Sequence, residues 1–199
     1  KDLDFGESEV FTLVGAGGIG KTRLAIHAAA EQPTAFSDGV FFVAMAGAPT
    51  AALMAPTIAA SIGLSLFGAG NAEEQVLAHL QDKQILLVLD NLEQLLAAPA
   101  EPAPSAIQAL YQGSSLPLLE AILQQAPGFK LLATSREQLN LSGEWVFDLQ
   151  GLPTPPPIAE HQTSGAGLAA YSSVALFLQT ARRVQSGFTL ALEEQGAVA

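Results

Sequence analysis

The stretch that most limits the possible fold is VFTLVGAGGIGKTRLA, residues 10–25. It begins with a short apolar run rich in β-forming residues, and a glycine-rich turn follows. The turn, Gly15 to Thr22, fits the pattern Gly-x-x-x-x-Gly-Lys-Thr, and the residues after Gly20 have a helical pattern. A buried strand that passes through such a loop into a helix is typical of α/β proteins that hold a phosphate at the helix N-terminus. The stretch therefore predicts a phosphate-binding loop.

Each residue type in this loop suits that role. Backbone N–H groups can surround a phosphate where the side chains are small or absent. Lys21 would bring a positive charge to the β- and γ-phosphates, and Thr22 would offer a hydroxyl to Mg²⁺. Arg23 follows the motif directly, although a solvated position on the helix is the simpler interpretation of its side chain. The candidate nucleotide-binding residues are Gly15, Gly17, Gly18, Ile19, Gly20, Lys21, Thr22 and Arg23.

Further strands and helices alternate along the chain. Buried strands are predicted at residues 39–44, 84–90 and 129–136, and a fifth, shorter strand is predicted at residues 145–149. Helices are predicted at residues 20–31, 49–62, 72–82 and 116–125. Alternation of this kind predicts a five-stranded parallel sheet with helices on both faces.

Two segments interrupt the alternation and suggest the domain limits. Residues 97–115 are rich in Ala and Pro and are predicted to be an inserted loop in a core that spans residues 1–151. Residues 152–169, with PTPPP near their start, are predicted to be a linker. Residues 170–185 are predicted to form an amphipathic helix, and we expect residues 170–199 to be the start of a helical domain of a longer protein.

A carboxylate follows the most apolar strand. Asp90 ends QILLVLD, so it is expected at the carboxyl edge of the sheet, where ligands of open α/β folds bind. Asp90 is therefore our candidate Mg²⁺ ligand beside Thr22, and helix capping is its alternative role. The next residue is Asn91, where many related ATPases have a second acid. Glu93 is the nearest carboxylate, and a catalytic base and a surface residue are equally good interpretations of it.

A cation follows another core strand. Arg136 ends LLATSR, and from the same edge it could sense a γ-phosphate, with Thr134 or Ser135 bonding to that group. The alternative is a surface ion pair with Glu137 or Glu144. The candidate catalytic residues are thus Lys21, Asp90, Glu93 and Arg136.

Charge and composition exclude several classes. The formal net charge is −11 with only eight basic residues, which disfavours direct nucleic-acid binding. The absence of cysteine excludes disulfides and thiolate metal sites. Residues 39–72 carry no charge, but their Pro, Gly, Ser and Thr residues favour a strand and helix over a membrane span. We expect a cytoplasmic protein.

Four stretches together resemble a known family. They are FTLVGAGGIGKTRLA, ILLVLDNLEQLL, LLATSREQLNLSGEWVFDLQGLP and SVALFLQTARR. They are similar to the signal-transduction ATPases with numerous domains (STAND), and most of all to the NB-ARC-like modules of large bacterial transcriptional regulators. The loop motif is generic, whereas LDN-x-E and T-S-R-E are more discriminating.

The resemblance implies a three-layer P-loop NTPase fold of the additional-strand (ASCE) type, with Asp90 in the Walker B role and Arg136 in the sensor role. It implies ATP or ADP with Mg²⁺ as ligands, and effector and repeat domains elsewhere in the same chain. It also implies self-assembly in the ATP state. Two family stretches, an upstream Gly-Arg-Glu and a downstream Gly-Leu-Pro-Leu, are not among these 199 residues.

The leading functional hypothesis is a regulatory ATP/ADP switch with at most slow, Mg²⁺-dependent hydrolysis. The alternative is a P-loop enzyme such as a small-molecule kinase, which would need an acceptor pocket and an Arg-rich lid. A third hypothesis, a nucleic-acid motor, is disfavoured by the acidic charge.

Overall fold

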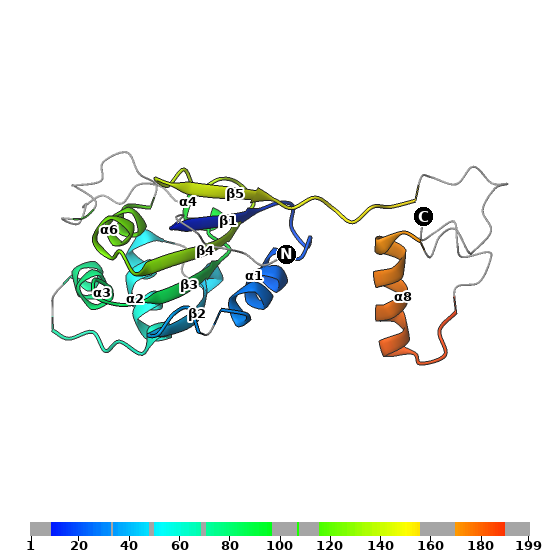
Figure 1. The fold of residues 1–199 in the computed structure, drawn as a ribbon, viewed down its shortest axis with the longest axis horizontal. Helices are drawn as coiled ribbons and strands as arrows, with labels where there is room; N and C mark the ends of the chain where they lie inside the picture. Colours follow the sequence, from blue (N-terminus) through cyan, green and yellow to red (C-terminus); the bar gives the residue numbers. More distant parts are fainter. Residues whose placement is uncertain are drawn as a thin grey trace. The chain divides into compact units, whose positions relative to one another are not determined.

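Figure 1 shows the computed structural model of the chain, which describes residues 9–32, 34–47, 50–68, 71–96, 107, 116–155 and 170–189. The chain divides into two compact units, residues 1–149 and 150–199. The predicted insert at residues 97–115 lies outside the described residues except for Ile107, and so does most of the predicted linker.

The first unit is built on a sheet of five parallel strands in the order β2-β3-β4-β1-β5. The strands are β1 (Val10–Val14), β2 (Gly39–Ala44), β3 (Ile85–Asp90), β4 (Phe129–Ser135) and β5 (Glu144–Asp148). Each of the five predicted strands is present, with ends that differ by no more than one residue. The predicted α/β P-loop NTPase fold is confirmed by this strand order together with the loop between β1 and the helix after it.

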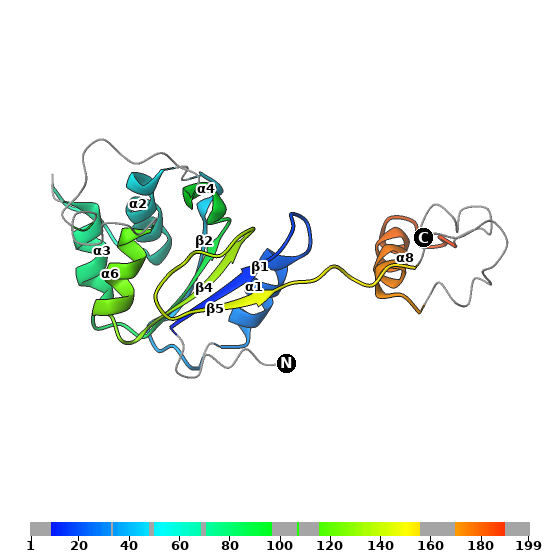
Figure 2. The same ribbon diagram turned by 90° about the horizontal axis from the view of Figure 1, so that it is seen from above.

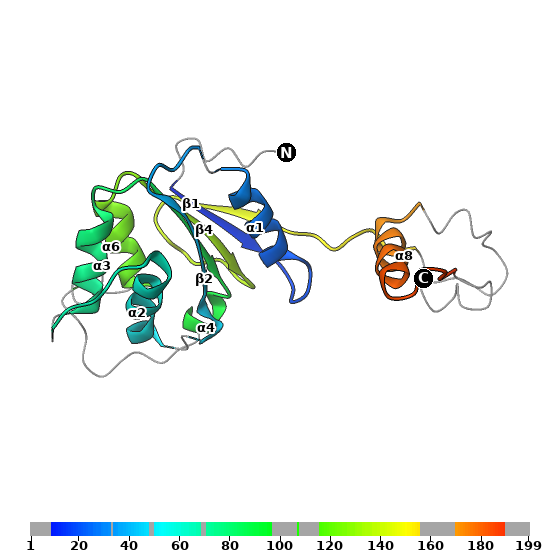
Figure 3. The same ribbon diagram turned by 90° about the horizontal axis from the view of Figure 1, so that it is seen from below.

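Helices cover both faces of the sheet, as Figures 2 and 3 show from opposite sides. Helix α1 (Lys21–Ala30) packs on one face through Ala25, Ala28 and Ala29. The other face is covered by α2 (Ala51–Ile62), α3 (Ala72–Leu80) and α6 (Pro117–Gln125), with the short α4 (Glu93–Leu96) after β3. Alternate residues of a strand point to opposite faces, so Leu86 and Val88 belong to the α1 core and Leu87 and Leu89 to the other core.

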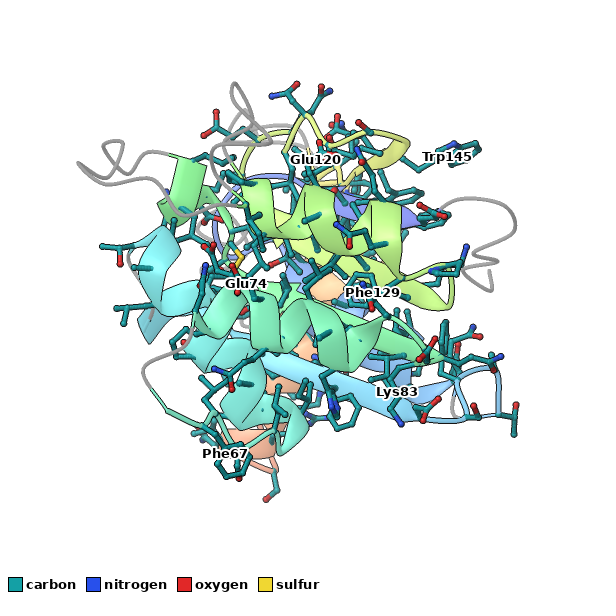
Figure 4. All side chains as sticks on the ribbon, turned by 90° about the vertical axis from the view of Figure 1, so that its left-hand side faces the viewer. Phe67, Glu74, Lys83, Glu120, Phe129 and Trp145 are labelled. Atoms are coloured by element: carbon teal, nitrogen blue, oxygen red, sulfur yellow. The ribbon has the colours of Figure 1, made fainter. Side chains whose placement is uncertain are left out.

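The central strands are buried and the outer strands are not. All six residues of β3 are buried, as the apolar run ILLVLD predicts. The expectation that residues 39–44 form a buried strand was wrong in one respect. Strand β2 lies at an edge of the sheet, and Phe42 is 43% exposed. At the opposite edge Trp145 of β5 projects outward (Figure 4) and is 65% exposed, although its ring lies 5.9 Å from that of Phe11.

The uncharged residues 39–72 contain β2, the 3₁₀ turn Met45–Gly47 and α2. Pro56 lies inside α2, and Gly63 ends the helix in the left-handed conformation. Among the described residues no helix is both long and apolar enough to cross a bilayer.

The second unit contains the amphipathic helix α8 (Ser172–Val184). Val174 is its buried residue, and Phe177 meets the ring of Phe188 edge to face at 6.0 Å. The hydroxyl of Ser173 donates to the Pro153 carbonyl at 2.8 Å and so links the start of the helix to the chain before it.

A surface ion pair joins the starts of β2 and β3. Asp38 accepts from the Lys83 ammonium at 3.0 Å and from the Gln84 N–H at 2.9 Å, and Lys83 lies at the margin of the unit in Figure 4. The Gln84 backbone hydrogen bond, and then Lys83, hold the pKa of Asp38 below its ordinary value.

We expect this ion pair to give a small stabilisation that depends on pH. Because the pKa is lower in the folded than in the unfolded chain, the stabilisation is present near neutrality and is lost as the pH falls through the folded-state pKa. Asp38→Ala should lower Tm by about 1–2 °C at pH 7, and the difference from the wild type should shrink towards zero at an acid pH below the folded-state pKa of Asp38. Thermal melts at the two pH values check this, and an equal difference at both would contradict it.

Candidate functional site

The glycine-rich loop lies where β1 passes into α1. Gly20 caps the helix with φ of 103°, a left-handed conformation that glycine adopts without strain. A Cβ on Gly15 would lie 2.9 Å from the carbonyl oxygen of Leu149, the residue after β5, so the backbone there permits no side chain. The first N–H groups of a helix have no acceptor within the helix and carry its positive dipole end. The loop therefore presents an anion-binding helix N-terminus beside an exposed backbone.

Lys21 holds its charge inside the loop. Its ammonium donates to the carbonyl oxygens of Gly15 at 2.8 Å and Ala16 at 3.0 Å, and the residue is only 7% exposed. An ammonium has three N–H donors, and these two bonds leave one for a further acceptor. The loop thus fixes a cation at its own centre, next to the first turn of α1.

The side chains of Thr22 and Asp90 meet although they are 68 residues apart in the sequence. The Thr22 hydroxyl donates to Asp90 Oδ1 at 2.6 Å. Thr22 comes from the first turn of α1, and Asp90 is the last residue of β3. The two candidate Mg²⁺ ligands therefore lie side by side at the carboxyl edge of the sheet.

Thr134 supports this pair from the adjoining strand. It is fully buried, and its hydroxyl also donates to Asp90 Oδ1 at 2.6 Å. The same hydroxyl oxygen accepts from the N–H of Asn91 at 3.1 Å. Asn91 has a φ of 67°, in the left-handed region that Asn tolerates better than most residues. Thr134 thus fixes both the carboxylate and the backbone turn that follows it.

Arg136 and Glu93 form an ion pair next to the loop. Arg136 Nε lies 3.2 Å from Glu93 Oε1. Arg136 Nη2 lies 3.5 Å from where a Cβ on Gly17 would stand, so the guanidinium borders the loop. The surface pair with Glu137 or Glu144 that the sequence left open is not formed. Glu144 instead accepts from the N–H groups of Leu139 and Asn140, and the Ser135 hydroxyl accepts from the N–H of Glu137.

The remaining candidates differ in their surroundings. Ile19 is half-buried, and its N–H bonds to the Ala16 carbonyl at 3.4 Å, which closes the loop on itself. Arg23 is exposed on α1, and its side chain forms no hydrogen bond or ion pair with the described residues. Its location fits the solvated helix position that the sequence also allowed.

The side chains present suit a nucleoside triphosphate with Mg²⁺. A hydroxyl and a carboxylate, already in contact, are the hard oxygen ligands that Mg²⁺ prefers. Lys21 and the start of α1 supply positive potential for phosphate oxygens. Gly17 leaves space between the loop and the Arg136 guanidinium that a larger side chain would fill. The loop, the carboxyl end of β3 and the carboxyl end of β4 therefore converge on one site.

The hydrogen bond between Thr134 and Asp90 was not predicted from the sequence. Thr134 or Ser135 was expected to contact a phosphate, whereas the Thr134 hydroxyl bonds to Asp90. The strand register indicates this contact, because Ala133 pairs with Leu89 and the next residues on the two strands are Thr134 and Asp90. Predicting the contact would have required knowing that β3 and β4 are neighbours in the sheet, and the sequence alone does not give the strand order.

Comparisons with known proteins agree with this geometry. The NB-ARC domain model matches residues 1–97. A protein of Mycobacterium tuberculosis (strain ATCC 25618 / H37Rv), named as an HTH-type transcriptional regulator, is 30% identical over 192 residues. The match covers 96% of this chain and 18% of that protein. The regulatory protein AfsR of Streptomyces griseus is 30% identical over 149 residues, covering 70% of this chain and 13% of AfsR.

Among solved structures, a signal-transduction ATPase with numerous domains and a tetratricopeptide repeat sensor, from Pyrococcus horikoshii, aligns with a TM-score of 0.43. It is 15% identical, and the alignment covers 96% of this chain and 25% of that one. This chain spans less than a fifth of the length of the curated relative from Mycobacterium tuberculosis.

Proposed function

From the premise that this chain carries an NB-ARC-like P-loop module of the STAND class, we propose that it is the ATP/ADP-binding switch of a larger bacterial transcription regulator. The observation that carries the proposal is the contact between the Thr22 hydroxyl and Asp90 at 2.6 Å. It joins the loop motif to the strand carboxylate that a Mg²⁺-dependent nucleotide site requires.

Each residue has a definite task in this proposal. Lys21 and the N–H groups at the start of α1 bind the phosphate chain. Thr22 and Asp90 hold Mg²⁺, which when bound neutralises charge on the β- and γ-phosphates. Thr134 keeps Asp90 in place, and Arg136 lies at the loop where its guanidinium can contact a γ-phosphate. The last contact distinguishes triphosphate from diphosphate.

A switch fits the site better than a rapid enzyme. A ligand shifts a conformational equilibrium only by its differential affinity for the two states, and Arg136 offers such a difference. Efficient hydrolysis would need a base that reaches the attacking water. Asn91 occupies the position after Asp90, and the carboxylate of Glu93 is bound by Arg136. Hydrolysis is therefore expected to be slow.

The partners in this proposal follow from the relatives and the charge. The matched relatives are several times longer than this chain, so effector and repeat domains in the same polypeptide are the expected partners, with self-assembly in the ATP state. The net charge of −11 makes direct nucleic-acid binding by these residues unfavourable. A cytoplasmic location agrees with an ATP-dependent regulator.

The hydrolysis rate tests the switch against the enzyme alternative. We expect Mg²⁺-dependent release of phosphate from ATP at well below about 1 s⁻¹, compared with typical enzyme turnover of about 10 s⁻¹. The hydrolysis rate is measured as phosphate release by the purified chain, and the Lys21→Ala variant serves as the blank. Many turnovers per second without any partner would contradict a switch. Phosphate transfer to an added small molecule would favour a kinase.

A further inference from the structure

The surroundings of the Glu93 carboxylate indicate a more specific role than that of a catalytic base. It is the first residue of α4, and its side chain is only 17% exposed. Its Oε1 is 3.2 Å from Arg136 Nε. Its Oε2 is buried and has no hydrogen-bond partner among the described residues. One carboxylate oxygen is thus committed to the arginine, and the other is closed off from solvent.

This geometry is unfavourable for a base. A general base must come within hydrogen-bond reach of the water whose proton it takes. Oε2 has almost no contact with solvent, and Oε1 is already paired with the guanidinium of Arg136, 3.2 Å from its Nε. Glu93 is therefore placed to bind Arg136 rather than to activate water.

The same geometry is favourable for orienting the arginine. A guanidinium is planar and has five N–H donors in a fixed arrangement. With Nε facing Glu93 in the ion pair, the four N–H bonds of the two terminal nitrogens remain for other acceptors, and Nη2 is at the loop beside Gly17. Arg136 itself is 68% exposed, so little else restrains it. Fixing Nε fixes the plane, and the terminal nitrogens with it.

We propose that Glu93 is the positioning residue for Arg136 and thereby sets the preference of the site for triphosphate over diphosphate. The proposal rests on the nucleotide site proposed above and deepens it. Glu93 acts through the arginine, so its removal should affect contacts to a γ-phosphate and leave contacts to the α- and β-phosphates unchanged. The loop, Lys21 and the Thr22–Asp90 pair are independent of Glu93 in the structure.

Binding constants of a non-hydrolysable ATP analogue and of ADP, both with Mg²⁺, test the proposal by calorimetry on the purified chain. We expect Glu93→Ala to reduce the ratio of analogue affinity to ADP affinity by about 10-fold, the size of one charge-assisted hydrogen bond, with ADP affinity unchanged. Arg136→Ala should reduce the ratio as much, and the double variant no further, because both changes remove the same interaction. Glu93→Gln keeps an acceptor for Nε and should retain most of the ratio.

A measurement without nucleotide distinguishes an effect of Glu93 on the position of Arg136 from an effect on the stability of the whole protein. The ¹⁵N-coupled proton of Arg136 Nε, assigned through its absence in Arg136→Lys, should exchange slowly with water in the wild type and quickly in Glu93→Ala. Circular dichroism confirms that each variant is folded. Unchanged exchange in Glu93→Ala would overturn the proposal.

The base role gives a different pattern. Glu93→Ala and Glu93→Gln would then both abolish hydrolysis while keeping the wild-type preference for the analogue, and that result overturns the positioning role. If the wild type binds neither nucleotide, the proposed function fails, whereas the exchange experiment still reports on the ion pair.

Discussion

Replacing Lys21 with alanine is expected to weaken the binding of both ATP and ADP by at least about 100-fold. The ammonium is held at the centre of the loop by the carbonyls of Gly15 and Ala16, next to the first turn of α1. The remaining N–H can make one charge-assisted hydrogen bond to a phosphate oxygen, which contributes about 1.5–3 kcal/mol, and the ammonium charge also attracts the neighbouring phosphate oxygens. Together these contributions amount to roughly 100-fold or more in affinity. Fluorescence titration with labelled nucleotides measures the loss.

The structure offers a matched control for this lysine. Lys83 carries the same charge, but it precedes β3 and so lies at the amino edge of the sheet, opposite to the loop. Lys83→Ala should leave nucleotide affinity within about 2-fold, because a surface charge this far from the ligand is screened by salt. Similar losses in both variants would mean that overall charge, and not the loop, determines binding.

The second large effect is expected at Asp90, where two substitutions separate charge from structure. Asp90→Asn keeps an oxygen that can accept from Thr22 and Thr134, so the fold should survive with little change in Tm. It removes the negative charge, so the strengthening of ATP binding by Mg²⁺ should fall by about 10-fold or more. ATP is titrated into the wild type and into Asp90→Asn, once in the presence of Mg²⁺ and once with EDTA, and the ratio of the two affinities measures this.

Asp90→Ala should in addition destabilise the protein. It leaves the hydroxyls of Thr22 and Thr134 without their acceptor, and an unsatisfied buried donor costs about 1–3 kcal/mol. Thermal melts should therefore rank wild type and Asp90→Asn close together and Asp90→Ala clearly lower. Mg²⁺ dependence that persists in Asp90→Asn would contradict the assignment of this carboxylate to the metal.

The elements and the convergence of the site could be predicted from the sequence. A parallel sheet places the ends of its strands at one edge, so Asp90 and Arg136 were expected near the loop, and the structure brings them there. The short apolar runs of β1, β3 and β4 located these central strands to within one residue, because both faces of a central parallel strand are buried.

The position of each strand across the sheet could not be predicted. GVFFVA at residues 39–44 has the composition of a central strand, yet β2 is at the edge and its Phe42 is exposed. Periodicity reports which faces of a strand are covered, not which strands lie beside it. The bond from Thr134 to Asp90 and the pair of Glu93 with Arg136 depend on that lateral order, and so they became visible only in the structure.

The central claim is that one site binds nucleotide and distinguishes ATP from ADP through Arg136. The most direct test is the ratio of the dissociation constants of a non-hydrolysable ATP analogue and ADP, measured with Mg²⁺ in wild type and Arg136→Ala. The account predicts saturable binding of both, with a preference for the analogue that falls by about 10-fold in the variant. Equal affinities in the wild type, or a preference that survives without Arg136, would contradict it.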